Sequence, residues 1–498
     1  MSARPAMRGG LRLDGHKSRP LEQPVFVAAP PRTAVVALDQ GSGEDARPLV
    51  TPGATVRVGT RVAAGRGGSA DLHSPVSGVL REITVLPTPR GTGHCLVIDA
   101  DGRDEPDPGI APLDWQALEG TSLIERLDAG GIAGLGGAAF PAAAKLATGR
   151  EAGVDRLLLN GAECEPWICC DDALMRERAG DVVLGARVML AACGAARATI
   201  AVEDDKPQAI AALEAAVAVC GDGRVEVLGL PAVFPLGAEG PLIAAVTGRE
   251  VPHDGLPPQV GVVCHNVGTA AAVARLVRDG MPCIARVVTV TGSGVRRPAN
   301  IEARIGTPIT ELVAACDGYT EAPSPRHLIA GGSLTGRALA TDAAGLTKGL
   351  NCVLVATADD LPPRGPEMPC IRCGDCATVC PAGLLPQQLH RAARSDDADG
   401  LARFGLADCI ECGCCDYVCP SAIPLTARFR AARARHRQHE EQRRRATEAR
   451  ARYDRHQQRI AAEAEREREA FEDARRRARD GAERSEPASD ASGGPERD

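Results

Sequence analysis

The sequence contains two cysteine-rich runs, CIRCGDCATVCP at residues 370–381 and CIECGCCDYVCP at residues 409–420. Each run has the spacing C-x2-C-x2-C-x3-C-P, which is the ligand pattern of a pair of [4Fe-4S] clusters. Three thiolates in one tight loop can reach three corners of a cubane cluster, and a distant cysteine then supplies the fourth ligand. The two runs therefore predict a chain that transfers electrons.

The spacing is similar to that of bacterial two-cluster ferredoxins, in which the fourth cysteine of each run binds the other cluster. On that pattern one cluster would be held by Cys370, Cys373, Cys376 and Cys419, and the second by Cys409, Cys412, Cys415 and Cys380. Such cross-ligation makes the two clusters near neighbours. Cys414 does not fit the spacing, and we expect it to pack beside the second cluster.

Structural zinc and a disulfide framework are the alternative interpretations of these cysteines. Structural zinc usually takes two separated pairs of ligands, whereas each run offers three close cysteines and a fourth before proline. Disulfide frameworks are typical of small secreted chains, and residues 1–30 lack the apolar core of a signal peptide. Iron–sulfur clusters are favoured over both alternatives.

The composition indicates a large protein with several domains. The chain has 498 residues, 44% of them hydrophobic, and its length suggests about three domains. The formal net charge of -7 gives no electrostatic case for nucleic-acid binding. We expect no transmembrane helix, because no stretch of about twenty residues is apolar and free of charges and helix breakers. Any association with a membrane is expected to be peripheral.

The hydrophobic pattern predicts a multidomain α/β protein that begins with a β-rich region. In residues 1–115 valines alternate with polar residues between Pro-Gly turns, which predicts a barrel-sandwich or hammerhead-like domain. This region resembles biotinyl and lipoyl carrier domains, but no lysine occupies the hairpin where a prosthetic group would attach. In residues 116–284 buried strands alternate with helical segments, which predicts an α/β nucleotide-binding core with a mostly parallel sheet.

The remaining residues suggest three further regions. Residues 285–358 combine short strands with one helix, which predicts a β-grasp-like module that positions the clusters. Residues 359–428 hold the cysteine runs and predict a two-cluster, ferredoxin-like helical domain. Residues 429–498 are rich in Arg, Glu and Ala and predict a charged, solvated helix without a core-facing side. The last residues, SEPASDASGGPERD, are expected to be disordered.

A glycine-rich loop, AGGIAGLGGAAFP at residues 129–141, is the candidate phosphate-binding element of the core. Its glycines leave backbone N–H groups accessible to a phosphate, and the residues that follow could open a helix whose N-terminus favours anions. The loop does not follow a clear strand, so it is not the dinucleotide-binding fingerprint. Taken alone, it fits a packing turn as well as a phosphate cradle.

The blocks GLGGAAFP, NGAECEP, VEDDKP and HNVGT occur in this order before the cysteine runs. Together they resemble the RnfC family, a component of the Rnf-type ion-translocating oxidoreductase complexes, from Gly9 to about Arg428. The first two blocks are also similar to the flavin- and NADH-binding subunit of respiratory complex I. The resemblance implies a site that holds FMN against NADH, with residues Gly134, Gly136, Gly137, Phe140, Lys145, Asn160, Glu163, Glu165, Glu239, Asn266 and Thr269.

Within this implied site, Glu163 and Glu165 could accept hydrogen bonds from ribose or ribityl hydroxyls, and a solvated surface loop is the alternative. The chain departs from the family pattern at three places. Trp167 stands where a tyrosine is usual, Gly240 and Pro241 replace a Lys-Gln pair, and the N-terminal GGLRLDGHK lacks the usual His-Pro-Pro centre.

The resemblance also implies a function, which is a peripheral, NADH-oxidising oxidoreductase subunit at the cytoplasmic face of the cell inner membrane. Electrons would pass from NADH to FMN, through two [4Fe-4S] clusters, to the other subunits of a membrane-bound complex and ultimately to ferredoxin, coupled to Na+ or H+ movement. The cofactors carry the redox chemistry and the protein positions them. Two alternatives stay open, which are a soluble flavin and iron–sulfur cobalamin reductase and a non-catalytic subunit that only relays electrons.

Overall fold

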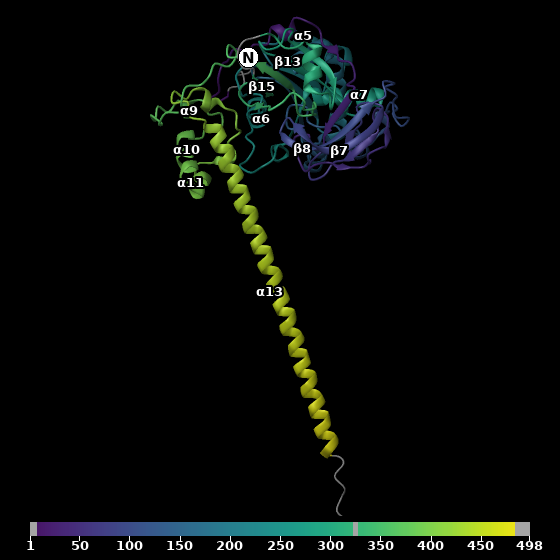
Figure 1. The fold of residues 1–498 in the computed structure, drawn as a ribbon, viewed down its shortest axis with the longest axis vertical. Coiled ribbons are helices and arrows are strands. Elements are labelled where there is room, and N and C mark those ends of the chain that lie inside the picture. The colour runs from purple at the N-terminus through teal and green to yellow at the C-terminus, as the bar shows by residue number, and fades with distance from the viewer. Residues whose placement is uncertain (1–6, 322–326, 484–498) are drawn as a thin grey trace, which may run out of the picture. The chain divides into compact units, whose positions relative to one another are not determined.

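The structure, a computed structural model, describes residues 7–321 and 327–483. The chain forms two compact units, Met1–Phe429 and Arg430–Asp498. Residues 485–498, predicted to be disordered, lie outside the described residues. Figure 1 labels the main elements.

The β-rich domain near the N-terminus consists of two antiparallel sheets. One has the order β2-β8-β7-β4, and the other β3-β5-β6. Alternate residues such as Val36, Leu80 and Ile98 are buried between the sheets, as the period-two pattern predicts. The strands are β2 (Thr33–Ala37), β3 (Arg47–Pro48), β4 (Thr55–Val56), β5 (Arg61–Ala64), β6 (Leu72–His73), β7 (Gly78–Thr88) and β8 (Gly91–Ala100).

The α/β core contains a four-stranded parallel sheet with the order β11-β10-β9-β12. Leu157 and Leu159 point into one hydrophobic cluster and Leu158 into another, so helices cover both faces of the sheet. This arrangement confirms the predicted parallel α/β core. Its strands are β9 (Arg156–Gly161), β10 (Arg197–Glu203), β11 (Val225–Leu230) and β12 (Val262–Asn266).

The helices of this core come before, between and after its strands: two precede β9, two lie between β9 and β10, and one or more follow each later strand. They are α1 (Gly120–Ala129), α2 (Ala142–Ala152), α3 (Cys170–Glu177), α4 (Ala179–Cys193), α5 (Pro207–Cys220), α6 (Glu239–Thr247) and α7 (Val267–Asp279), with short 3-10 turns at η2 (Trp115–Ala117) and η3 (Pro257–Val260). The glycine-rich loop connects α1 to α2 and follows no strand, as the sequence indicates.

A mixed six-stranded sheet with the order β1-β14-β13-β17-β15-β16 follows the core. Its strands are β1 (Phe26–Val27), β13 (Ala285–Thr291), β14 (Ala299–Arg304), β15 (His327–Ala330), β16 (Arg337–Ala338) and β17 (Cys352–Ala356), with one helix, α8 (Ile309–Ala315). The edge strand β1 pairs in parallel with β14, although the sequence pattern groups it with the β-rich domain. The N-terminal residues therefore extend into a sheet built mostly from residues far along the chain.

The cysteine runs lie in a small helical region. Its elements are α9 (Asp375–Thr378), α10 (Pro386–Arg394), α11 (Ala398–Arg403), η4 (Leu406–Asp408) and α12 (Cys414–Tyr417). The runs share one backbone shape, since Gly374 and Gly413 both have positive φ, as do Arg372 and Glu411. A one-turn helix follows each glycine. The sequence repeat is therefore also a structural repeat.

Helix α13 (Leu425–Glu483) forms the described part of the second unit from Arg430 onward. Most of its side chains are charged, which confirms the predicted charged helix, and the large apolar side chains of Tyr453, Ile460 and Phe471 are exposed. Within residues 7–321 and 327–483, no helix has the length and apolar character needed to cross a membrane.

A buried ammonium group joins three parts of the first unit. Lys348 is 1% exposed, and its Nζ donates to the carbonyl oxygens of Asp71 and Gly131, both at 2.7 Å. Its backbone N–H donates to the side chain of Gln40 at 2.7 Å. Lys348 thereby connects the β-rich domain, the start of the glycine loop and the segment before β17.

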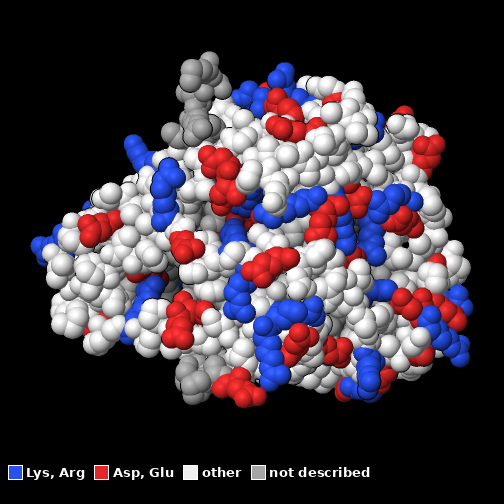
Figure 2. Space-filling model, turned by 90° about the horizontal axis from the view of Figure 1, so that it is seen from above, with Lys and Arg blue, Asp and Glu red and all other residues white. Residues whose placement is uncertain are grey.

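Charged side chains of both signs cover the surface. Figure 2 shows acidic and basic side chains interspersed over the face seen from above, with no broad area of one sign among the described residues of that face. Many charged side chains of the described residues form ion pairs, for example Arg304 with Asp104 at 2.8 Å. This face therefore provides no extended basic surface for a polyanion.

The contact between α4 and α7 allows a test of the packing. A Cβ atom on Gly185 of α4 would lie 1.9 Å from the carbonyl oxygen of Ala270 of α7, whereas one on Gly180 of the same helix would meet nothing within 4 Å. We expect Gly185→Ala to lower the free energy of unfolding by about 1–3 kcal/mol, as overpacking does. Gly180→Ala is the control and should be neutral or stabilising by up to about 1 kcal/mol. Thermal unfolding followed by circular dichroism under anaerobic conditions measures both, and equal melting temperatures would contradict the close helix contact.

Candidate functional site

A cavity of about 210 Å3 lies where strands β9 and β12 end, and we name it the strand-end cavity. Ligands of parallel α/β sheets usually bind at the carboxyl ends of the strands. Residues of the core, the mixed-sheet domain and the second cysteine run all contribute to its wall. They are Gly136, Asn160, Glu163, Cys164, Glu165, Ile168, Asp171, Phe234, Pro235, Gly237, Ala238, Asn266, Thr335, Asn351, Ile410 and Cys412.

A second cavity, also of about 210 Å3, adjoins the first, and we name it the loop cavity. The two share Gly136, Glu165, Ile168, Thr335 and Asn351. Besides these residues, the loop cavity is lined by Gln40, Gly41, Pro89, Arg90, Gly137, Ala330, Gly331, Gly336, Arg337, Thr347, Gly349 and Leu350. The combined space thus extends from the cysteine-run side to the β-rich domain.

The glycine loop is closed by its own hydrogen bonds. The N–H of Gly134 donates to the carbonyl of Phe140 at 2.8 Å, and the N–H of Ala139 donates to the carbonyl of Gly134 at 3.0 Å. The N–H of Leu135 donates to Oγ1 of the fully buried Thr269 at 2.9 Å, which fixes the loop to α7. A Cβ atom on Gly136 would lie 3.1 Å from the Cβ of Asn266. Because residue 136 is glycine, no side chain stands between the loop backbone and Asn266, and the cavity wall is thin at this point.

Two asparagines at the strand ends hold neighbouring segments. The Nδ2 of Asn160 donates to the carbonyl of Gly237 at 2.7 Å. The Oδ1 of Asn266 accepts from the N–H of Gly268 at 2.8 Å and so caps the N-terminus of α7. The Nδ2 of Asn266 donates to the carboxylate of Asp171 at 2.6 Å. Both amides thereby fix the shape of the cavity edge.

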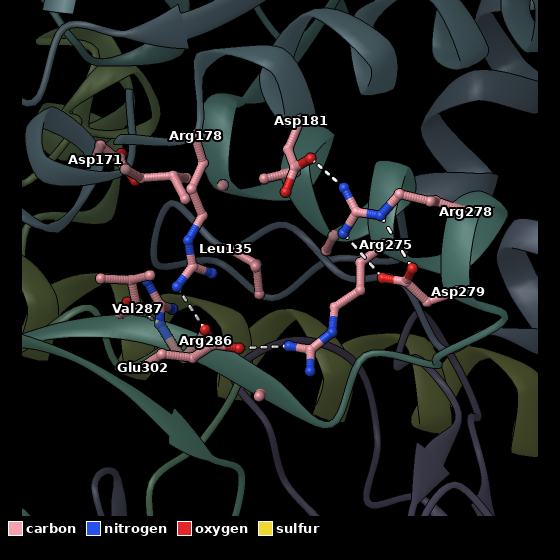
Figure 3. Close-up of a pocket in the computed structure, with 15 residues that line it drawn as sticks. Leu135, Asp171, Arg178, Asp181, Arg275, Arg278, Asp279, Arg286, Val287 and Glu302 are labelled. Carbon is pink, nitrogen blue, oxygen red and sulfur yellow. Dashed lines mark hydrogen bonds and ion pairs between the residues drawn. The ribbon is translucent and has the colours of Figure 1, made fainter. Parts of the chain in front are cut away.

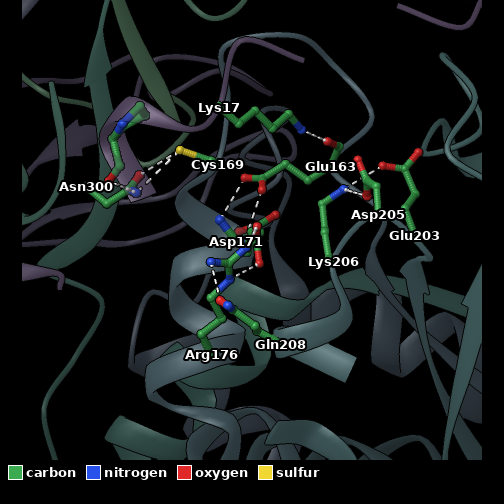
Figure 4. Close-up of polar contacts among 12 residues, drawn as sticks. Lys17, Glu163, Cys169, Asp171, Arg176, Glu203, Asp205, Lys206, Gln208 and Asn300 are labelled. Carbon is green, nitrogen blue, oxygen red and sulfur yellow. Dashed lines mark hydrogen bonds and ion pairs between the residues drawn. The ribbon is translucent and has the colours of Figure 1, made fainter. Parts of the chain in front are cut away.

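The half-buried carboxylates of Glu163 and Glu165 bind backbone N–H groups. Glu163 accepts from Asp171 at 2.7 Å and Asp172 at 3.0 Å, in the first turn of α3, where negative charge is stabilised. Glu165 accepts from the N–H groups of Leu334 at 3.0 Å and Thr335 at 2.8 Å, in the mixed-sheet domain. Figure 4 shows Lys17 donating to the backbone carbonyl of Glu163. The acidic loop is therefore a junction between domains.

Asp171 is a site residue that the sequence interpretation missed. Burial raises its pKa to about 7, and the nearby Glu163 carboxylate adds to this effect, while the hydrogen bond from Asn266 opposes it. Burial therefore favours the protonated form of this carboxyl group. The only signal for it in the sequence is its position in CCDD, directly after the NGAECEPW block.

The structure brings some of the expected flavin-site residues together and leaves others outside. Asn160, Glu163, Glu165, Asn266 and Gly136 line the strand-end cavity, and Gly137 lines the loop cavity. Among the described residues, the linings of both cavities lack the remaining expected site residues, Gly134, Phe140, Lys145, Glu239 and Thr269. Lys145 instead pairs with Glu239 at 2.5 Å and donates to the carbonyl of Cys264 at 3.2 Å.

The N-terminal residues 9–17, which we name the N-terminal strap, link the cavity walls to the cysteine runs. Gly10 donates its N–H to the carbonyl of Val379 at 2.9 Å, and Leu11 donates to the carbonyl of Phe234 at 2.7 Å. The ring of His16 stacks on Trp167, with centroids 4.4 Å apart and planes inclined by 8°. The indole of Trp167 is therefore covered by the strap and is 8% exposed.

The cysteines of the two runs gather around two small cavities. One cavity is lined by Cys370, Cys373, Cys376 and Cys419. The other is lined by Cys380, Cys409, Cys412, Cys414 and Cys415. Apart from Cys414, which lies outside the ligand spacing, each group combines three cysteines of one run with the last cysteine of the other, which is the arrangement that cross-ligation of two cubane clusters requires. The thiols present therefore fit two [4Fe-4S] clusters.

Four family models match successive parts of the chain. The RnfC barrel sandwich hybrid domain matches residues 5–103, the Nuo51 FMN-binding domain residues 127–275, the SLBB domain residues 287–338 and the 4Fe-4S dicluster domain residues 369–423. The matches agree with the predicted FMN and iron–sulfur cofactors and with the order barrel sandwich, flavin domain and cluster domain.

Several curated proteins, each the RnfC component of an ion-translocating oxidoreductase complex, are similar over most of the chain. The protein from Pseudomonas aeruginosa is 45% identical, over 89% of this chain and 57% of its own length. The protein from Rhodobacter capsulatus is 39% identical, over 86% of this chain and 83% of its own length. The protein from Yersinia enterocolitica is 39% identical, over 88% of this chain and 63% of its own length. The chain thus spans between about half and four-fifths of the length of these relatives.

The grouping of the cysteines gives a direct test. If cross-ligation holds, Cys376→Ala should damage the cluster at the first cavity, and Cys380→Ala the cluster at the second, because these thiols lie at different cavities. We expect two different losses of EPR signal from the reduced protein and a loss of about half the iron and sulfide in each variant. Cys414→Ser should retain the iron and sulfide of both clusters, since its thiol falls outside the ligand spacing although it lines the second cavity. Cys220→Ser, on α5 and in the lining of neither cavity, is the control and should retain both signals. Identical losses in the two alanine variants would instead indicate that each run binds its own cluster.

Proposed function

Because this chain belongs to the RnfC family of ion-translocating oxidoreductase complexes, we propose that it is the subunit through which electrons from NADH enter such a complex. FMN would accept them, and two [4Fe-4S] clusters would pass them on. Family membership favours this function over a soluble cobalamin reductase. The other subunits, an ultimate link to ferredoxin and the coupled movement of Na+ or H+ are parts of the same proposal.

One observation carries the proposal, which is that a single cavity adjoins both kinds of cofactor site. Gly136 and Asn266 line the strand-end cavity on the side of the FMN-binding domain. Ile410 and Cys412, from the second cysteine run, line the same cavity. An FMN in this cavity would lie beside the cluster held by Cys409, Cys412, Cys415 and Cys380. This cluster is therefore proposed as the first acceptor of electrons from the flavin.

The protein groups of the strand-end cavity would position the flavin. FMN, when bound, supplies the change from two-electron to one-electron transfer. The thin wall at Gly136 gives a flat ring access to the strand ends, and Asn160 and Asn266 keep those ends in place. Glu163 and Glu165 hold the acidic loop against α3 and the mixed-sheet domain. Lys145 and Glu239 support the outer edge of the core as an ion pair.

The loop cavity would admit NADH, because it adjoins the strand-end cavity and is lined by two arginines. Arg90 pairs with Asp39 at 3.1 Å, and Arg337 lies on β16. Guanidinium groups bind phosphates through several N–H donors at once. We infer that these two side chains bind the pyrophosphate, so that the nicotinamide points toward the shared wall of the two cavities.

The location of the subunit follows from the same proposal. A chain of this family would bind the other subunits peripherally, at the cytoplasmic face of the membrane, where NADH is available. The cysteines Cys370 and Cys373 are exposed and belong to the first run. In the proposed order of transfer, the cluster of this run comes after the cluster beside the strand-end cavity. The first-run cluster is therefore proposed as the outlet to the partner subunits.

The full chain, purified and kept anaerobic, tests this function. We expect FMN together with iron and sulfide for two clusters, and bleaching of the visible absorbance when NADH is added. The flavin absorbance should fall before the cluster absorbance in a stopped-flow record. A protein with intact clusters that neither binds FMN nor is reduced by NADH would be a non-catalytic relay, and the proposal would be wrong.

The wall at Gly136 gives a test of the flavin position. Gly136→Ala should weaken FMN binding by about tenfold, because the added methyl group meets the side chain of Asn266 and fills the cavity edge. Gly240→Ala, where a Cβ meets nothing within 4 Å, is the control. Fluorescence titration of the flavin-free protein measures both affinities, and the iron content of both variants should equal that of the parent. Unchanged FMN affinity in Gly136→Ala would place the flavin elsewhere.

A further inference from the structure

A third cavity, of about 310 Å3, lies where the FMN-binding domain meets the mixed sheet. We name it the arginine cavity after Arg178, Arg275, Arg278 and Arg286, which line it from the α3–α4 junction, α7 and β13 (Figure 3). Among the described residues, the arginine cavity and the strand-end cavity have one lining residue in common, Asp171. Its volume is at the lower end of the range of about 300–1,000 Å3 that is typical of ligand pockets. It is therefore a separate site of small-molecule size.

One half of the arginine cavity has more positive than negative charge. Figure 3 shows Arg178 and Arg275 reaching the same carboxylate, that of Glu302 on β14. The distances are 2.6 Å for Arg178 and 2.5 Å for Arg275. Because one carboxylate serves two guanidinium groups, one positive charge remains without compensation at this point.

Arg286 adds a second positive charge to the same half. It is 5% exposed, and its guanidinium donates to the backbone carbonyls of Val287, at 3.1 Å, and Lys348. In the described part of the chain, no carboxylate forms an ion pair with it. Asp171 lies within electrostatic range, but burial raises the pKa of its carboxyl group and so weakens it as a counter-charge. A buried cation that binds only carbonyl oxygens is stabilised further by an anion.

The opposite half of the cavity has one more negative than positive charge. Arg278 pairs with Asp181 and, at 2.9 Å, with Asp279. Leu135, Leu174 and Val287 provide apolar parts of the wall. The cavity thus offers a cationic end, apolar wall and, at the other end, an arginine paired with two carboxylates. Such a surface fits a small organic anion better than a bare inorganic one.

We propose that the arginine cavity binds a small organic anion, whose carboxylate or phosphate group contacts Arg178, Arg275 and Arg286 and whose carbon part packs on Leu135 and Val287. The bound anion would connect α7 of the FMN-binding domain with β13 and β14 of the mixed sheet. Guanidinium groups bind carboxylates and phosphates in the same forked geometry, so both kinds of anion share this chemistry.

Isothermal titration of the full-length holoprotein in a low-chloride buffer tests the site, with malonate, methyl phosphate and inorganic phosphate as probes. We expect saturable binding of malonate or methyl phosphate, and weaker binding of inorganic phosphate, which lacks a carbon part. Tighter binding of malonate would identify a carboxylate ligand, and tighter binding of methyl phosphate a phosphate ester. Absence of saturation by all three probes up to about 10 mM would overturn the proposal.

Three variants separate the site from general attraction of anions. Arg275→Gln should weaken binding of the best probe by about tenfold, because it removes a charge-assisted hydrogen bond. Glu302→Gln should tighten binding, because it removes the competing carboxylate, and a gain in affinity cannot result from misfolding. Arg249→Gln, which removes an exposed arginine paired with Asp155 at 3.0 Å, is the control and should leave the affinity unchanged. Equal effects of Arg275→Gln and Arg249→Gln, or weaker binding by Glu302→Gln, would contradict the proposed contacts.

Discussion

The buried ammonium of Lys348 is the constraint on which the arrangement of the domains depends. Removing an ammonium from water is costly, and burial lowers the pKa of this group. The cost is offset only if the carbonyls of Asp71 and Gly131 stay in place, since they are its hydrogen-bond acceptors. The β-rich domain and the start of the glycine loop therefore have one relative position. The carbonyl of Lys348 also accepts from Arg286, so the same residue supports the arginine cavity.

With the domains fixed in this way, the strand-end cavity can be assembled from distant parts of the sequence. Glu163 is bound to α3, and Glu165 to the mixed-sheet domain through Leu334 and Thr335. Carboxylates that the family resemblance predicts to face a ligand thus also hold the walls around it. Under the proposed function, a rigid wall of this kind would keep a flavin and a cluster at a constant separation.

The local features of the site could be predicted from the sequence, and the features that depend on long-range packing could not. The cysteine spacing and the parallel α/β core are visible in short windows, because their ligands or apolar residues recur at fixed intervals. A short stretch of sequence does not include both partners of a long-range contact. The contact of Cys412 with the strand-end cavity and the position of Thr335 beside Glu165 are contacts of this kind. The pairing of edge strand β1 with β14 is hidden from the sequence for the same reason, since β14 lies far along the chain.

The N-terminal strap has a consequence for the biogenesis of the protein. The strap leaves the ribosome well before its partners Trp167, Phe234 and Val379, which are synthesised much later. Contacts between residues so far apart in sequence form late, because the chain between them must first lose its freedom. The strap therefore docks after its partner segments have folded, and the indole of Trp167 is covered only at that late step.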